Sequence, residues 1–121
     1  MLCAPINFSR KFATFADHWS PKIIAQMNQH HFKLVKFIGD FVWHRHEHTD
    51  EVFIVLEGTM NIDFPDECVE LNSGEMLVVP KGVEHKPFAE AECHVLVIER
   101  ADTINTGNAG GGMTAANDVW I

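Results

Sequence analysis

Short apolar runs separated by turn residues limit the fold of this 121-residue chain more than any other feature. After residue 40, runs of strand length occupy residues 52–56, 59–64, 76–79 and 93–98. Pro65-Asp66-Glu67 and Asn72-Ser73-Gly74 are typical turn sequences between them. Short strands with turns about every eight to twelve residues indicate an all-β sandwich or barrel. The intervals are too short for repeated βαβ crossovers, which excludes a parallel α/β fold.

The pattern within each run predicts which strand faces are buried. Residues 59–64 alternate between apolar and polar side chains, so this strand should have one buried and one solvated face. Residues 52–56 are continuously apolar, as expected of a strand that is covered on both sides. We interpret 76–79 and 93–98 as further buried strands.

The first 40 residues carry helix and strand signals of their own. The spacing of the large apolar residues over 8–19 is close to that of a short amphipathic helix, which Ser9 could cap. Strands are predicted over 22–27 and 32–38, and Gly39-Asp40 is expected to end the second of them. The N-terminal part is therefore expected to add one short helix to an all-β fold.

Composition excludes several classes of partner and location. The net charge of -8 without a basic stripe argues against binding to nucleic acid or to an anionic membrane. Three cysteines without a Cys-x-x-Cys pair are interpreted as free thiols in a reducing compartment. Arg10 and Lys11 interrupt any signal-peptide core, and no apolar run approaches the ~18 residues of a membrane span. A soluble, cytoplasmic protein is expected.

The length of the chain fits a single domain, 1–121. We divide it into an N-terminal extension (1–31), a barrel (32–100) and a glycine-rich segment with a C-terminal tail (101–121). The tail ends on Trp120-Ile121, and a disordered tail rarely ends on two large apolar residues. We therefore expect the tail to dock, either on its own barrel or on a second subunit.

Three histidines alternate at positions 44, 46 and 48, and a glutamate follows at position 51. Residues two apart in an extended chain share a face, so His44 and His46 can direct two imidazoles at one point. Glu51 can reach the same point after a short turn. Imidazoles and a carboxylate are typical ligands of divalent transition metals. The stretch therefore predicts a metal site; a polar hairpin loop without metal is the alternative.

A second segment, 74–85, delivers another histidine from a rigid turn. A strand leads into Pro80, and Gly82 permits the chain to reverse just before His85. A fixed backbone of this kind suits a metal ligand.

Together the two segments resemble the two motifs of the cupin superfamily. The first motif, Gly-x5-His-x-His-x3,4-Glu-x6-Gly, is matched by His44, His46, Glu51 and Gly58, whereas Gly39 lies one residue too close to His44. The second, Gly-x5-Pro-x-Gly-x2-His-x3-Asn, is matched by Gly74, Pro80, Gly82 and His85, with Ala89 in place of the asparagine. The segments VWHRHEHTDEVF, VPKGVEH and TINTG further resemble the small single-domain group labelled mannose-6-phosphate-isomerase-like.

The resemblance implies a double-stranded β-helix, or jelly-roll barrel, with a metal inside and frequent homodimers. Carried over residue by residue, the implied metal ligands are His44, His46, Glu51 and His85. His48 shares their parity and remains an alternative ligand, although a solvated loop position is the preferred interpretation.

Four protein ligands permit different chemistries. In a tetrahedron they form a closed, structural zinc site. In an octahedron they leave two positions open for a small molecule, which suits Mn, Fe, Co or Ni. We therefore expect a divalent transition metal (Mn, Fe, Ni, Co or Zn) and a small-molecule ligand. The activity would be that of an isomerase or an oxygenase acting on a small polar substrate. A non-catalytic module that binds a small ligand or the metal, and a structural domain for dimerisation, are the alternatives.

Catalysis would also need an acid or base beside an open position, and no catalytic residue is assigned. Asp50, Lys81 and Glu84 flank the motifs and are interpreted as surface charges. Lys36 and Glu99 lie on predicted strands and could face inward. Four aromatic residues could line a pocket, although core packing explains most of them: Phe41, Trp43, Phe53 and Phe88.

The remaining histidines carry less weight. His30 and His31 lie in a polar turn and are expected to be solvated. His94 is expected to be packed or surface-exposed, and His18 has no evident partner.

Overall fold

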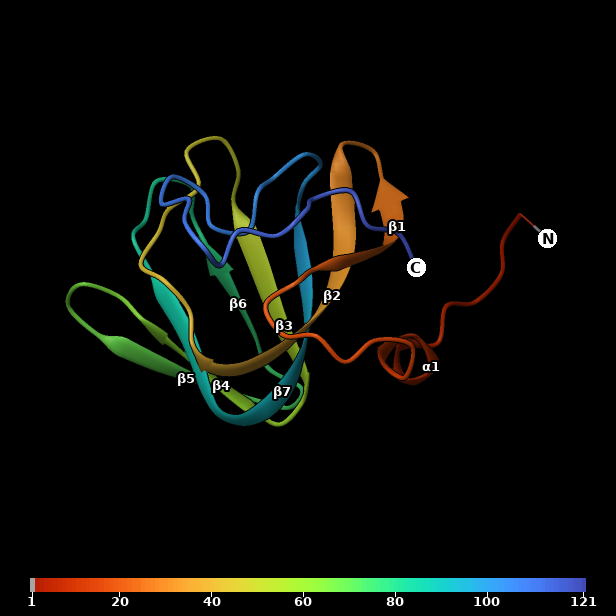
Figure 1. Cartoon of the computed structure of the whole chain (residues 1–121), viewed down its shortest axis with the longest axis horizontal. Coiled ribbons are helices and arrows are strands. Elements are labelled where there is room, and N and C mark those ends of the chain that lie inside the picture. Colours follow the sequence, from red (N-terminus) through yellow and green to blue (C-terminus); the bar gives the residue numbers. More distant parts are fainter. Residues whose placement is uncertain (1) are drawn as a thin grey trace.

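The computed structural model describes residues 2–121, which form a curved antiparallel β-structure with a short helix (Figure 1). The helix α1 spans Phe8–Phe12. The strands are β1 (Lys22–Met27), β2 (His30–Asp40), β3 (Glu51–Glu57), β4 (Thr59–Asp63), β5 (Cys68–Asn72), β6 (Met76–Val79) and β7 (Lys86–Arg100). The prediction of an all-β jelly roll with a short N-terminal helix is confirmed. Helix α1 is far too short to cross a membrane, and residues 2–121 contain no helix that could span one.

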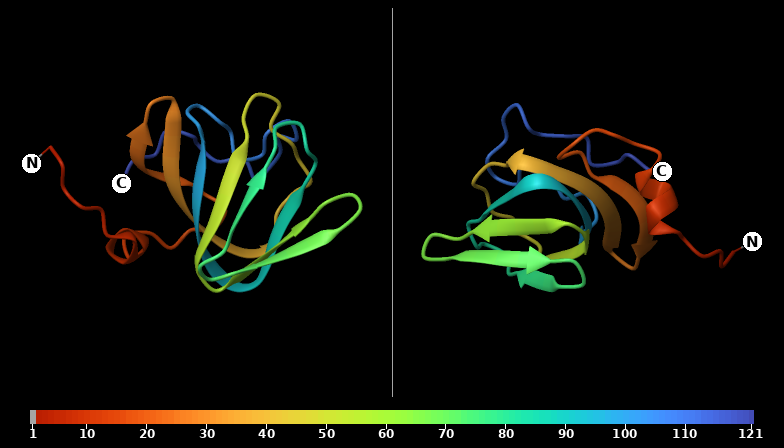
Figure 2. Two further views of the ribbon diagram at one scale, coloured as in Figure 1. Left: turned by 180° about the vertical axis from the view of Figure 1, so that it is seen from behind. Right: turned by 90° about the horizontal axis from the view of Figure 1, so that it is seen from below.

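The larger part of the sheet has the order β1-β2-β7-β3-β6, and all its neighbours are antiparallel. The long strand β7 pairs with β2 along most of its length, and its beginning also pairs with β4. The β4–β5 hairpin lies across the barrel from β1 and β2 (Figure 2). Strand β7 thus joins both halves of the barrel and brings residues of distant segments to one interior.

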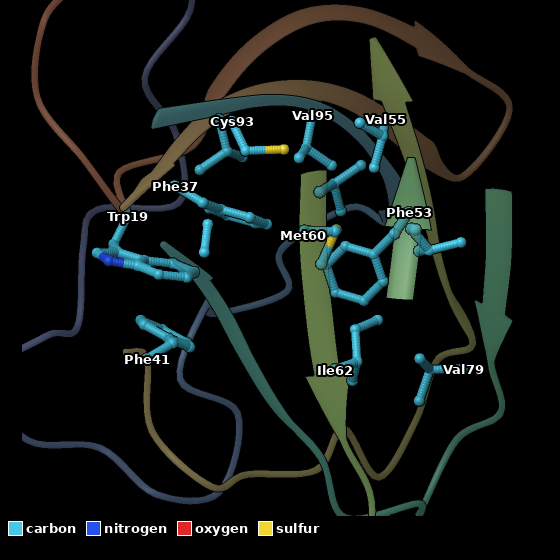
Figure 3. Packing of buried hydrophobic residues seen from close by; sticks show 14 residues of the cluster. Trp19, Phe37, Phe41, Phe53, Val55, Met60, Ile62, Val79, Cys93 and Val95 are labelled. Atoms are coloured by element: carbon cyan, nitrogen blue, oxygen red, sulfur yellow. The ribbon is translucent and has the colours of Figure 1, made fainter. Parts of the chain in front are cut away.

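The core fills this interior with aromatic and branched side chains (Figure 3). The ring of Trp19 stacks between those of Phe37 and Phe41, with centroid distances of 4.2 and 4.7 Å. Trp19 has a φ of +57°, which is rare for a bulky residue. Its indole Nε1 donates to the carbonyl of Ile38 at 2.8 Å, and its backbone N–H donates to the carbonyl of Lys36 at 2.9 Å. These bonds and the stacking hold a strained residue in the core.

The predicted helix over 8–19 is wrong in length and in its cap. Helix α1 ends at Phe12, and the N-cap is Asn7, whose side-chain oxygen accepts from the backbone N–H of Arg10 at 2.9 Å. The apolar residues of 8–19 do not share one face, because Phe12 packs outside the sheet and Trp19 packs inside the barrel. An extended connection between them is therefore required.

The predicted end of the second strand at Gly39-Asp40 is also wrong. The register shifts between Phe37 and Gly39, and β2 then continues to pair with β7 as far as Asp40. Gly39 has a φ of +74°, so it supplies a β-bulge where a break was expected. The bulge bends β2 around the barrel.

The neighbouring strands β3 and β6 differ in how far their outward side chains are covered. In β3, Phe53 and Val55 are buried, whereas Val52 and Ile54 are only partly covered. In β6 the outward Met76 and Val78 are 56% and 48% exposed. The prediction that 76–79 is a buried strand is therefore wrong for its outer face.

The C-terminal tail docks on its own barrel beside β1 (Figure 1). The backbone N–H of Ile23 donates to the carbonyl of Val119 at 2.7 Å, and that of Ile121 donates to the carbonyl of Ile23 at 3.1 Å. Trp120 itself stays 54% exposed, so the tail is held by its backbone and by Ile121.

Candidate metal centre

Two chain segments that lie far apart in the sequence meet at His44 and His85. The backbone N–H of each residue donates to the carbonyl of the other, at 3.0 and 2.9 Å. The two residues form an isolated antiparallel bridge outside the named strands. Their imidazole centroids consequently lie 4.4 Å apart. The bridge joins the two sequence motifs at the level of the backbone.

The structure brings together all four predicted residues, His44, His46, Glu51 and His85. One nitrogen or oxygen of each lies within 4.8 Å of those of the others. All four are buried, with exposed fractions of 2, 6, 6 and 0%. A metal ion with bonds of about 2.0–2.2 Å could join such atoms after a small inward movement.

Backbone carbonyls fix the orientation of two of the imidazoles. Nδ1 of His44 lies 2.9 Å from the carbonyl of Val42, and Nδ1 of His85 lies 2.8 Å from the carbonyl of Val83. A carbonyl can only accept, so Nδ1 carries the proton in both rings. Nε2 of His44 can then bind a metal through its lone pair. Nε2 of His85 lies 3.2 Å from Oε1 of Glu51, and it must release the proton of this hydrogen bond before it can bind a metal.

His46 supplies the clearest sign of a missing partner. Its Nε2 is buried and forms no hydrogen bond within residues 2–121. The nearest carboxylate oxygen, Oε1 of Glu51, lies 3.5 Å away. Buried polar atoms are rarely left without a partner, because desolvation then has no compensation. A metal ion at the centre of the four residues would satisfy this nitrogen.

The loop around Gly107 holds His46 from the other side. Gly107 has a φ of +52°, and a Cβ at this position would lie 2.2 Å from the carbonyl oxygen of Arg45 and 3.1 Å from Nδ1 of His46. Only glycine permits such a close approach. The glycine of the TINTG segment thus seats the loop against the predicted ligand.

The cluster concentrates negative charge on Glu51. Burial alone would raise the pKa of Glu51, but the imidazoles of His46 and His85 lower it well below its usual range. Burial lowers the pKa of His85, but the carboxylate of Glu51 outweighs burial and raises it. Burial and the neighbouring His85 lower the pKa of His44 to about 4. A neutral His44 beside an ionised carboxylate is the protonation state that metal binding requires.

A second carboxyl group, that of Glu99, lies behind Glu51. The two residues are direct partners across β3 and β7. Oε1 of Glu99 accepts a hydrogen bond from Nζ of Lys33 at 3.0 Å, whereas its buried Oε2 has no partner in the described chain. Burial and the charge of Glu51 raise the pKa of Glu99 well above its usual range, although Lys33 opposes this. The negative charge therefore stays on Glu51.

A small cavity adjoins the cluster on the inner side. The centres of water molecules can occupy about 30 Å³ of it, which corresponds to roughly two waters. His44, Glu51 and Glu99 supply polar groups to its wall, and the remaining lining is mainly apolar: Trp19, Pro21, Val35, Phe37, Phe41, Phe53, Pro87, Val97 and Asn105. Phe41 and Phe53 belong to the core, which was the preferred interpretation, and they also line this cavity, whereas Trp43 is 45% exposed.

Several predicted positions lie outside the cluster. His48 is exposed and lines an open surface pocket, so it does not join the other three imidazoles. Of the predicted surface charges, Glu84 pairs with Arg45 at 2.9 Å, and Asp50 accepts from the backbone N–H of Lys81 at 2.9 Å. Lys36 faces outward and donates to the carbonyl of Phe15.

The prediction that His31 is solvated is wrong, and His18 has a partner that the sequence did not indicate. His31 is only 8% exposed, because its ring lies against that of Trp120 in the docked tail. His18, for which no partner was evident, lies 2.8 Å from Glu92. Lys33, which bonds to Glu99, and Trp19, which lines the cavity, were not predicted to lie near the site. The parity of Lys33 with Val35 and Phe37 could have placed Lys33 on the inner face.

Comparisons with known proteins agree with this geometry. Residues 36–99 match the cupin domain family Cupin_2. The uncharacterized protein YdbB of Bacillus subtilis is 38% identical over 84 residues, which cover 67% of this chain and 74% of YdbB. The chain belongs to the cupin superfamily.

Two of the solved structures that are similar to this chain are bacterial crystal structures. A cupin-2 domain containing protein from Shewanella frigidimarina is 59% identical with a TM-score of 0.78, covering 78% of this chain and 93% of its own. Protein NMB1881 from Neisseria meningitidis is 39% identical with a TM-score of 0.74, covering 80% of this chain and 99% of its own. These similarities support the jelly-roll fold.

Proposed function

We propose that His44, His46, Glu51 and His85 bind one divalent transition metal, and that the bound metal holds a small polar molecule. The buried Nε2 of His46, which forms no hydrogen bond in the described chain, carries this proposal, because it lies beside potential metal-ligand atoms of the three other residues. Neutral imidazoles and an ionised carboxylate suit Mn, Fe, Ni, Co or Zn. His48 stays outside the ligand set.

Metal content tests the ligand set. Protein purified without an affinity metal column should contain about one metal per chain. His46→Ala should lose most of it, and His48→Ala is the matched control because His48 is an exposed histidine of the same segment. Unchanged metal in His46→Ala would refute the assignment.

Among the functions open to such a site, we favour metal-dependent catalysis, as in an isomerase or an oxygenase. Glu99 supports the catalytic function. It lines the same cavity as His44 and Glu51, and its Oε2 forms no hydrogen bond in the described chain. A ligand held at the metal would find there a group that can accept or donate a hydrogen bond. The apolar wall would exclude bulk water from that contact.

The access route limits the size of the ligand. The inner cavity holds only about two waters, so a larger ligand needs an opening. His46 also lines a wide surface pocket of about 580 Å³ together with Arg45 and Arg100. We propose entry from this side, with the reacting part of the ligand directed at the metal and toward Glu99.

Cobalt substitution distinguishes catalysis or ligand binding from a structural role. A site with open positions should show the weak visible absorption of higher-coordinate Co²⁺ and should respond to acetohydroxamate, a small chelating probe. The intense bands of tetrahedral Co²⁺ without any response would indicate a closed structural site. Glu99→Gln should bind Co²⁺ normally yet alter the response to the probe; an unchanged response would favour the non-catalytic binding module.

We further propose that the protein is a cytoplasmic homodimer of the mannose-6-phosphate-isomerase-like group. Exposed apolar side chains on β6 support self-association, and the TINTG loop against His46 supports the group assignment. Sedimentation analysis of the metal-loaded protein tests the dimer.

A further inference from the structure

Basic and imidazole side chains gather at the end of the barrel where β3 begins and β7 ends. His30, His48, Lys81 and Arg100 come from four separate segments of the chain, and all four are exposed. Figure 1 shows these segments at the upper end of the barrel. The four side chains line one surface hollow of about 370 Å³, which we call the basic hollow. Closure of the barrel thus brings together groups that are far apart in the sequence.

The charges of Lys81 and Arg100 have no partner within residues 2–121. Their backbone N–H groups donate to the side chains of Asp50 and Thr49, at 2.9 and 3.0 Å, whereas their own side chains form no hydrogen bond or ion pair there. The chain has 17 acidic residues against 9 lysines and arginines, so carboxylates are plentiful. Four other basic side chains do pair with carboxylates: Lys22, Lys33, Arg45 and Lys86.

Nearby carboxylates balance only part of the positive charge. Within the described chain, Asp50 is the one carboxylate that lines the basic hollow. Glu47 and Asp102 line the neighbouring pocket instead, and Glu47 is paired with Arg45. The basic hollow therefore keeps an excess of positive charge in a chain whose net charge is -8. Such a local excess attracts anions.

The basic hollow adjoins the pocket beside the metal cluster. His48 and Arg100 line both, and the neighbouring pocket reaches His46. Arg100 directly follows Glu99, which is the cross-strand partner of Glu51. Adjacent residues of a strand are about 3.3 Å apart, so the basic groups begin about one residue beyond the cluster.

We propose that Arg100 and Lys81 bind an oxyanion group, a carboxylate or a phosphate, of the molecule that the metal holds at its other end. A guanidinium offers paired N–H donors that match two oxygens of such a group, and an ammonium adds a compact charge. His30 and His48 line the same hollow and can supply further donors. The ligand is therefore a small organic anion that also carries a chelating group. The chelating end rests on the proposed function, whereas the oxyanion end needs no metal.

An NMR titration of the full-length, Zn²⁺-loaded protein with phosphate and, separately, with acetate tests the oxyanion end. The backbone amides of Lys81 and Arg100 should shift, and Arg100→Gln or Lys81→Gln should each raise the dissociation constant about tenfold. Both side chains are exposed, so the variants should fold, which melting curves will verify. Arg10→Gln is the matched control, because Arg10 is an exposed arginine on α1. The anion whose affinity falls more in Arg100→Gln identifies the group.

A series of chelators with an anionic tail tests the link between the two ends. Monohydroxamates of dicarboxylic acids, from succinic to suberic, carry a chelating group and a carboxylate at increasing separation. One member should bind the Zn²⁺-loaded protein about tenfold more tightly than acetohydroxamate, and Arg100→Gln should remove this advantage. A series in which no member gains affinity would overturn the link.

The remaining outcomes separate the oxyanion end from the metal site. Phosphate and acetate affinities that Arg100→Gln lowers no more than Arg10→Gln would overturn the site, since the anions would then bind unspecifically or directly to the metal. A protein that retains no Zn²⁺ but keeps the shifts that depend on Arg100 would refute the proposed function and uphold the oxyanion end.

Discussion

Gly107→Ala tests the claim that a loop far along the chain holds His46 in place. The new Cβ would lie 2.2 Å from the carbonyl oxygen of Arg45, well inside van der Waals contact, and this neighbour is backbone that cannot rotate away. A φ of +52° adds a second penalty. The conformation costs a non-glycine residue about 1–2 kcal/mol, and relief of the overlap should cost about 1–3 kcal/mol more.

Gly110→Ala separates the two penalties. Gly110 has a similar φ of +61°, yet within 2–121 a Cβ there would meet nothing closer than 4 Å. Urea unfolding should therefore show a loss of about 1–2 kcal/mol for Gly110→Ala and of about 2–5 kcal/mol for Gly107→Ala. Calorimetric titration with Co²⁺ should also show weaker binding for Gly107→Ala alone, because the loop would push on Nδ1 of His46. Equal unfolding free energies and equal affinities in the two variants would refute the reasoning.

Three further predictions follow from buried or paired groups. Burial raises the pKa of the Cys93 thiol to about 11, so iodoacetamide should label Cys3 and Cys68 in the native protein and Cys93 only after unfolding; native labelling of Cys93 counts against its burial. Hydrogen bonds to His18 and His94 lower the pKa of Glu92 to about 2 from 4.5. The resulting stability is present above pH 4.5 and lost toward pH 2, so the melting temperature of Glu92→Gln should fall less over this range; parallel curves would contradict the pairing. Lys33→Met should destabilise the chain by about 1–3 kcal/mol in urea, since it leaves the buried Oε1 of Glu99 without its hydrogen-bond donor, whereas Lys11→Met should change little.

The alternation of His44 and His46 in an extended segment was sufficient to predict that they share a site. His85 could be placed beside them only through its motif, because a bridge between segments 41 residues apart depends on how the whole barrel closes. The parity of Glu99 with Val95 and Val97 gave its direction, but its contact with Glu51 depends on the register of β3 and β7.

The errors share one physical cause, which is that tertiary packing overrides local pattern. Gly39 looked like a terminator and is instead a bulge inside β2. Helix α1 stops early because Phe12 and Trp19 belong to different clusters. His31 shares the inward parity of Lys33, but its contact with Trp120 depends on a tail some 90 residues away, which no local pattern reports.

Anomalous diffraction from crystals of the metal-loaded protein tests the central claim most directly. One strong peak should lie about 2.0–2.3 Å from Nε2 of His44, His46 and His85 and from a carboxylate oxygen of Glu51. A peak bound by other residues, or the absence of any peak among these four side chains, would contradict the account.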